Sequence, residues 1–189
     1  MSNICVFCAS SVTKNVYIAE DCAKLAELIA KRMDTLVYGG AFVGLMGLLA
    51  DIVLKNGGKV IGIMPKSLTS REIAKEGLTE SYITESMAER KELLIAKSDA
   101  FVILPGGFGT LDELFEVVCL CSLGLCRKPI IILNSQNYYD KLLEFLQYAD
   151  EQGMLPYHYQ NLISVVSKPE EIFNAIANYK LPPVPEWLR

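Results

Sequence analysis

The feature that most constrains the fold is a regular alternation of short β-rich runs with helical patterns. The run Phe101–Leu104 is continuously apolar, as in a buried strand, whereas Ile18, Cys22, Leu25 and Ile29 recur at helical spacing. We expect strands at Ile4–Ala9, Thr35–Tyr38, Lys59–Met64, near Tyr82–Ile83, and at Ala100–Leu104, Pro129–Leu133 and Ile163–Val166. We expect helices at Val16–Arg32, Gly44–Asn56, Met87–Ser98, Thr110–Leu123, Tyr138–Glu151 and Pro169–Ala177. This order predicts a single doubly wound, Rossmann-like α/β fold with a mostly parallel sheet and helices on both faces.

The length and net charge of the chain indicate a single domain and argue against several classes of partner. The 189 residues fit one domain, with residues 181–189 as an extended proline-rich tail. A formal net charge of −4 argues against a nucleic-acid partner, which would require clustered Lys and Arg. No apolar run reaches the length of a membrane span, and the start of the chain lacks a signal-peptide pattern. We therefore expect a cytoplasmic protein with no membrane partner.

The six cysteines lie in predicted strands and helices or at their ends, which is typical of small buried apolar residues in a reducing compartment. Cys5 and Cys8 have the spacing of a redox motif, but that motif requires a loop that leads into a helix. The only histidine is His158, so a zinc site lacks ligands. We predict no metal.

A glycine-rich turn offers a candidate phosphate site. The strand Phe101–Leu104 runs into Pro105-Gly106-Gly107-Phe108-Gly109, and Thr110 opens a predicted helix. Glycines let the backbone approach a ligand closely, and the free N–H groups and dipole of a helix N-terminus favour an anion. The alternative is a tight turn without a ligand. A second turn, Tyr38–Gly44, either borders the same crevice or only allows close packing of helix and sheet.

Two charged residues stand out beside this turn. Arg90 shares a helix face with Met87 and Leu94, so it interrupts a stripe that should be buried and needs an anion, either a ligand or a carboxylate such as Glu113 or Glu116. Glu113 follows Thr110 at the spacing of a capping box, so it could instead bond back to the start of its own helix.

Taken together, these motifs resemble the cytokinin-activating phosphoribohydrolases, the LONELY GUY family, whose members are often labelled lysine decarboxylases. The resemblance covers nearly the whole chain. Its parts are Val6–Ser11, Tyr38–Gly40 with Gly44–Gly47, Gly57–Gly62, Arg71-Glu72, Met87–Lys91 and Ser98–Phe101. The most specific part is Pro-Gly-Gly-x-Gly-Thr-x-x-Glu at Pro105–Glu113.

The resemblance implies hydrolysis of the N-glycosidic bond of a nucleoside 5′-monophosphate, which releases the free base and ribose 5-phosphate. It implies that Arg90 and Glu113 are catalytic. It places substrate contacts at Ser10, Glu72, Lys91, Gly106, Gly107, Phe108, Gly109 and Thr110. It implies no cofactor and a homodimer. A chain that is 51% hydrophobic, with apolar helix positions such as Leu111 and Phe115, is consistent with a dimer.

This sequence departs from the family pattern at Ala41, at Ala88 and at Cys119–Ser122, which leaves the preferred base open between plain and isopentenylated adenine. Two rival functions remain. A pyridoxal-phosphate lysine decarboxylase would require a Schiff-base lysine, which no motif marks. A non-catalytic nucleotide or cofactor carrier, as in the related molybdenum-cofactor carriers, would need the phosphate turn but not both Arg90 and Glu113.

Overall fold

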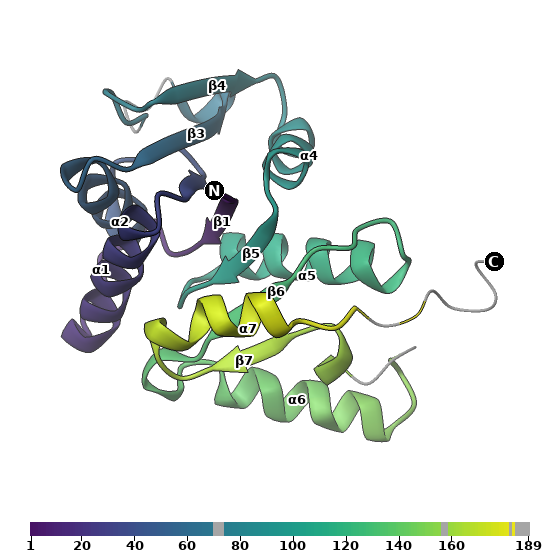
Figure 1. The fold of residues 1–189 in the computed structure, drawn as a ribbon. Helices are drawn as coiled ribbons and strands as arrows, with labels where there is room; N and C mark the ends of the chain where they lie inside the picture. Colours follow the sequence, from purple (N-terminus) through teal and green to yellow (C-terminus); the bar gives the residue numbers. More distant parts are fainter. Residues whose placement is uncertain (70–73, 156–158, 182, 184–189) are drawn as a thin grey trace.

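A computed structural model describes residues 1–69, 74–155, 159–181 and 183, and it has the expected three-layer α/β/α architecture (Figure 1). The seven strands are β1 Asn3–Phe7, β2 Thr35–Tyr38, β3 Lys59–Pro65, β4 Glu80–Thr84, β5 Ala100–Ile103, β6 Ile130–Leu133 and β7 Ser164–Val166. They form one sheet in the order β4-β3-β2-β1-β5-β6-β7, and every pairing is parallel.

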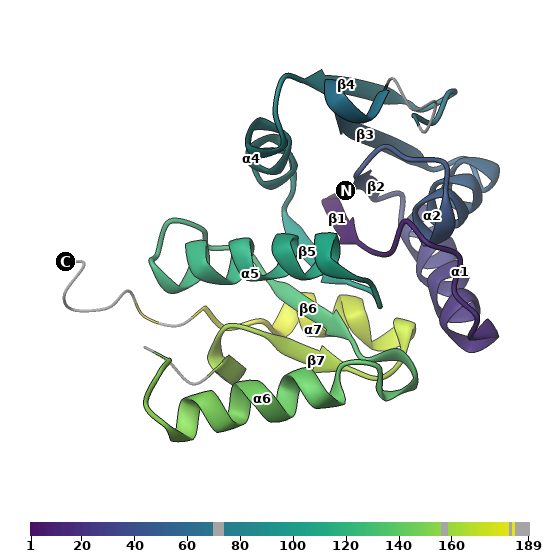
Figure 2. The same cartoon turned by 180° about the vertical axis from the view of Figure 1, so that it is seen from behind.

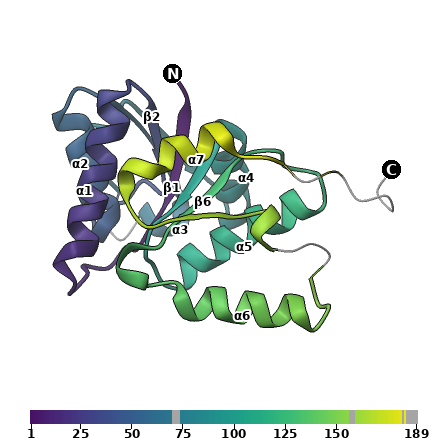
Figure 3. The ribbon, with the colours of Figure 1, turned by 60° about the horizontal axis from the view of Figure 1, so that its bottom comes forward.

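The helices cover both faces of this sheet. They are α1 Val16–Lys31, α2 Gly44–Lys55, α3 Lys66–Thr69, α4 Met87–Lys97, α5 Phe108–Ser122, α6 Asp140–Glu151 and α7 Ile172–Asn178, with short 3-10 turns at Ser135–Asn137, Tyr159–Asn161 and Pro169–Glu171. Helices α1, α2 and α7 lie on one face, and α4, α5 and α6 on the other (Figures 2 and 3).

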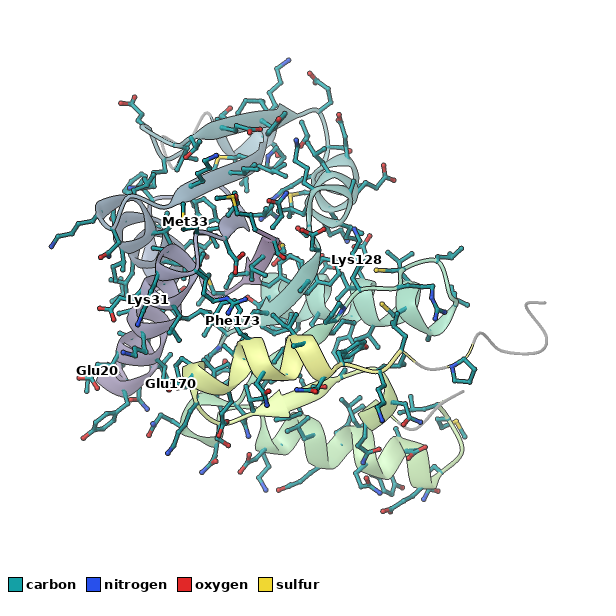
Figure 4. The ribbon with its side chains drawn as sticks, in the orientation of Figure 1. Glu20, Lys31, Met33, Lys128, Glu170 and Phe173 are labelled. Atoms are coloured by element: carbon teal, nitrogen blue, oxygen red, sulfur yellow. The ribbon has the colours of Figure 1, made fainter. Side chains whose placement is uncertain are left out.

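The core consists of two clusters because successive strand residues point to opposite faces. On β1, Ile4 and Val6 pack toward α1 and α2, whereas Cys5 and Phe7 pack toward α4 and α5. Both faces of the central strands are thus apolar, as expected for a parallel sheet covered on both sides. At one end of the first cluster, the Arg32 guanidinium lies 4.2 Å from the ring centroid of Phe173, which Figure 4 places on α7 facing α1.

The strand order produces a switch point in the sheet, where a ligand-binding site is expected. The chain runs outward from β1 to β4, then returns to place β5 against the other edge of β1. Connections therefore leave β1 and β5 in opposite directions, and the loops beyond their carboxyl ends diverge. This switch point is where doubly wound folds bind ligands.

The structure corrects several sequence predictions. Helix α5 begins at Phe108, two residues before the predicted start at Thr110. The segment Lys66–Thr69, for which no helix or strand was predicted, forms the short helix α3. Cys119 is exposed, although it was predicted to be buried; the other five cysteines are buried and unpaired. The tail prediction falls mostly outside the described residues.

No helix in the described part of the chain has the length and apolar character needed to cross a membrane. Within those same residues, no group of three His, Cys, Asp or Glu side chains is arranged to hold a metal ion.

Candidate active site

A cavity of about 500 Å³ opens at the switch point, beyond the ends of β1, β2 and β5. Its polar lining comes from the loop after β1, from α4 and from the first turn of α5: Ser10, Ser11, Arg90, Gly107, Gly109, Thr110 and Glu113. Its apolar lining includes Val43, Met46, Met64, Leu68, Met87 and Phe108. Polar and methionine side chains thus line one cavity, which suits a ligand with a charged part and a flat apolar part.

The glycine-rich turn supplies part of the polar lining of this cavity. Gly107 is the N-cap of α5 and makes no side-chain capping bond, so the first amides of the helix have no side-chain partner at the cap. A Cβ at Gly106 would overlap the Thr110 side chain, which is buried against it. The turn therefore requires glycine where Thr110 packs, and it presents helix N–H groups toward the cavity, as anion sites do.

A buried ion pair stands beside this turn. Arg90 Nη2 lies 3.1 Å from Glu113 Oε1, and Arg90 Nε donates to the Ile63 carbonyl at 3.2 Å. Both residues are only 8% exposed. Arg90 interrupts the apolar stripe as predicted, and its partner is Glu113 rather than Glu116.

Burial raises the pKa of the Glu113 carboxyl to about 7, although the neighbouring Arg90 guanidinium lowers it. The raised pKa brings the ionisation of this carboxyl from the acidic range toward neutral pH. A carboxyl in this condition can both accept and donate a proton, which is typical of acid–base catalysts.

The capping box predicted from Thr110 and Glu113 is absent. Thr110 is the third residue of α5 rather than its cap, and the Glu113 side chain turns toward Arg90 instead of its own helix start. The competing interaction wins because a buried guanidinium without a carboxylate would be far more costly than an uncapped amide at a solvent-facing helix end.

The remaining predicted contacts divide into four groups. Ser10, Gly107, Phe108, Gly109 and Thr110 line the cavity. Gly106 instead borders a neighbouring cavity. Lys91 does not line the main cavity. Its ammonium lies 3.1 Å from Asp112 Oδ2 and also contacts Glu116 Oε2, and these two ion pairs link α4 to α5. Glu72 lies outside the described residues.

The second glycine turn does border the same cavity and also packs closely. Gly39 and Ala41 line the cavity. A Cβ at Gly47 would overlap the Phe42 carbonyl, and one at Gly44 would overlap the Ser10 backbone. The turn therefore both borders the cavity and allows close packing of helix and sheet, so the two alternatives considered for it are both correct.

Sequence reasoning missed the apolar wall. Met46 follows the second turn, Met64 is near the end of β3, and Met87 opens α4. Each lies close to the carboxyl edge of the sheet, so the rule that ligands bind at this edge could have found them.

Known proteins resemble this chain over most of its length. The family model described as "Possible lysine decarboxylase" matches residues 46–176. The chain is 41% identical over 177 residues to a probable cytokinin riboside 5′-monophosphate phosphoribohydrolase of Oryza sativa subsp. japonica, LOGL2, covering 93% of this chain and 72% of the relative. It is 40% identical to cytokinin riboside 5′-monophosphate phosphoribohydrolase LOG1 of Arabidopsis thaliana, covering 93% and 83%.

Among solved structures, similar folds occur in the molybdenum cofactor binding protein of Rippkaea orientalis and the Moco carrier protein of Chlamydomonas reinhardtii. The first has a TM-score of 0.70 at 22% identity and covers 93% of this chain and 95% of that one. The second has a TM-score of 0.69 at 18% identity and covers 94% and 96%. At these identities the likeness concerns the fold.

Proposed function

This chain belongs to the family of cytokinin riboside 5′-monophosphate phosphoribohydrolases, and we propose that it hydrolyses the N-glycosidic bond of adenosine 5′-monophosphates, plain or cytokinin-type. The products are the free base and ribose 5-phosphate. The observation that carries the proposal is the buried Arg90–Glu113 pair, which lines the same cavity as the glycine-rich helix start.

The 5′-phosphate binds at the first turn of α5, where the N–H groups after Gly107 and the Thr110 hydroxyl face the cavity. Ser10 approaches from the loop after β1. The family resemblance adds Glu72 and Lys91 as substrate contacts; for Lys91 this requires its ammonium to leave Asp112 or Glu116.

Glu113 is the proposed catalytic carboxylate. As the bond between C1′ and the base nitrogen breaks, its electrons leave with the base and positive charge builds on the ribose. Ionised Glu113 stabilises that charge and takes a proton from the attacking water, whose oxygen bonds to C1′. The departing base gains the proton that Glu113 took from the water, directly or through solvent, so it leaves as the neutral purine and the carboxylate is restored.

Arg90 holds the carboxylate in position and lowers the pKa of Glu113, which keeps part of the population ionised at neutral pH. A guanidinium has five N–H donors, so Arg90 can also bind the phosphate or the leaving base. The methionine-rich wall formed by Met46, Met64 and Met87 receives the base, since thioether side chains adapt to flat and irregular apolar groups.

The direct test is product analysis with Glu113→Gln. The wild type should release free adenine from AMP, detected by chromatography, whereas glutamine keeps the shape but cannot accept the proton. Turnover should fall at least about 100-fold while AMP still protects the variant against thermal unfolding. Normal turnover by the folded variant would refute the role of Glu113.

The rival functions fit the cavity less well. A pyridoxal-phosphate decarboxylase needs a lysine at the cofactor, and no lysine lines the main cavity in the described part of the chain. A carrier would not require a buried, proton-exchanging carboxyl beside its ligand. Release of adenine without added cofactor would exclude both rivals.

We also propose a cytoplasmic homodimer. The end of α5 and the turn after it present Leu123 and Leu125 to solvent, at 38% and 72% exposure, next to the partly buried Val118 and Leu120. A second copy of the chain would cover this surface.

A further inference from the structure

Two adjacent tyrosines bond to the segment that leads from β5 into α5. The buried Tyr139 donates its hydroxyl hydrogen to the Leu104 carbonyl at 2.7 Å, and Tyr138 donates to the Gly106 carbonyl at 2.8 Å. Their rings meet edge to face with centroids 5.0 Å apart. The pair therefore fixes one carbonyl on each side of Pro105, at the start of the phosphate turn.

The turn that presents these tyrosines has an unusual backbone. Gln136 and Asn137 have φ values of 54° and 58°, in the left-handed region that residues with side chains disfavour. The conformation is held by Asn134, whose side chain accepts from the Tyr139 N–H at 2.8 Å and donates to Asp140 at 2.7 Å. Strained turns persist only where their surroundings hold them, and they gather at functional sites.

The Gly106–Gly107 peptide separates two cavities. Gly107 lines the main cavity and also a second one of about 280 Å³, which is bordered by Gly106 and Tyr138. The described peptides are trans, so the Gly106 carbonyl and the Gly107 N–H point in opposite directions. Because the carbonyl bonds to Tyr138, the N–H points away from Tyr138.

We propose that Tyr138 is a positioning residue for the phosphate site: it holds the Gly106–Gly107 peptide so that the Gly107 N–H faces the substrate phosphate. This inference rests on the proposed function, which places the phosphate there. A peptide between two glycines turns over easily because neither residue has a Cβ. Without the tyrosine hydroxyl, the peptide can present its carbonyl oxygen to the phosphate, which repels an anion.

The test is Tyr138→Phe, which keeps the ring and its contact with Tyr139. Tyr138 is 49% exposed, so loss of its hydroxyl should leave the fold intact. The KM for AMP should rise about tenfold, the loss of one charge-assisted hydrogen bond, while kcat stays within about twofold. Adenosine, which lacks the phosphate, should inhibit both proteins equally. Tyr148→Phe, at an exposed position on α6, should change neither quantity.

Two results would overturn the role of Tyr138: an unchanged KM for AMP, or equal losses of AMP and adenosine binding. A third result, which concerns nucleotide binding by the wild-type protein, would count against the proposed function itself. If wild-type protein bound AMP no better than adenosine, the phosphate assignment and the role of Tyr138 would both fall.

Discussion

Gly39 shows how one residue without a side chain controls the chemistry of its neighbours. A Cβ at this position would overlap Arg90 Nη2 and lie 3.1 Å from Met46 Sδ. Both atoms are at the ends of flexible side chains, so Gly39→Ala should displace the guanidinium rather than the backbone. The displaced Arg90 would lower the pKa of Glu113 less than it does now.

This gives a pH prediction. Ionised Glu113 is the active form and its pKa is about 7, so kcat/KM of the wild type should rise with pH through about 7 and then level. In Gly39→Ala the midpoint should move to higher pH, with activity at pH 6.5 reduced about tenfold or more and partly restored at pH 9. The thermal midpoint should change little.

The control experiment makes Gly39→Ala in a protein that already carries Arg90→Lys. Lysine lacks the Nη2 atom that a Cβ at Gly39 would displace. Adding Gly39→Ala to Arg90→Lys should cost little further activity, as expected for two residues that act through one contact. An unshifted pH midpoint in the single variant would show that Gly39 does not act through Arg90.

At the scale of elements, Lys91 links α4 to α5 through Asp112 and Glu116, and thereby supports the helices that carry Arg90 and Glu113. Lys91→Met keeps the aliphatic length but removes the charge. We expect a stability loss of about 1 kcal/mol, measured by denaturant unfolding, because the bridge is partly exposed. If the Lys91 ammonium leaves Asp112 or Glu116 to contact the substrate, as proposed, the KM for AMP should also rise about tenfold; a KM that stays within about threefold would leave Lys91 only the role of linking the two helices.

The bounds of helices and strands could be predicted from the sequence where a single local signal, such as an apolar run or a glycine, determines them. The strand Thr35–Tyr38 and the start of α2 at Gly44 were predicted correctly, because apolar runs and glycines mark them. The start of α5 was wrong because Gly107 caps it without a side chain. Arg90 was predicted to face an anion, but only the fold could show that Glu113 and not Glu116 is near enough.

At the scale of the whole molecule, strand order decides what can meet in the cavity. Because β1 lies between β2 and β5, the loops after these three strands lie at the same edge of the sheet and border one cavity, although they are far apart in sequence. Met64 and Leu68 join the wall from β3 and α3, and no local pattern links them to Glu113. Local sequence patterns therefore did not mark the methionine-rich wall, which could be inferred only from the place of its residues near the carboxyl edge of the sheet, whereas the phosphate turn is a contiguous segment that a local pattern marks.

The last prediction concerns assembly. Single exposed leucines are ordinary, but Leu123 and Leu125 are both exposed at the end of α5, close in sequence to the partly buried Val118 and Leu120, and we expect a second copy of the chain to cover them. Light scattering at micromolar concentration should therefore give twice the chain mass of 21.0 kDa. Leu125→Asp should yield single chains, because an unpaired carboxylate in an apolar interface costs more than the contact contributes. Phe145→Asp, at an exposed position on α6, should remain dimeric. A wild-type mass of one chain, or equal dissociation by both variants, would show that this surface does not join two copies.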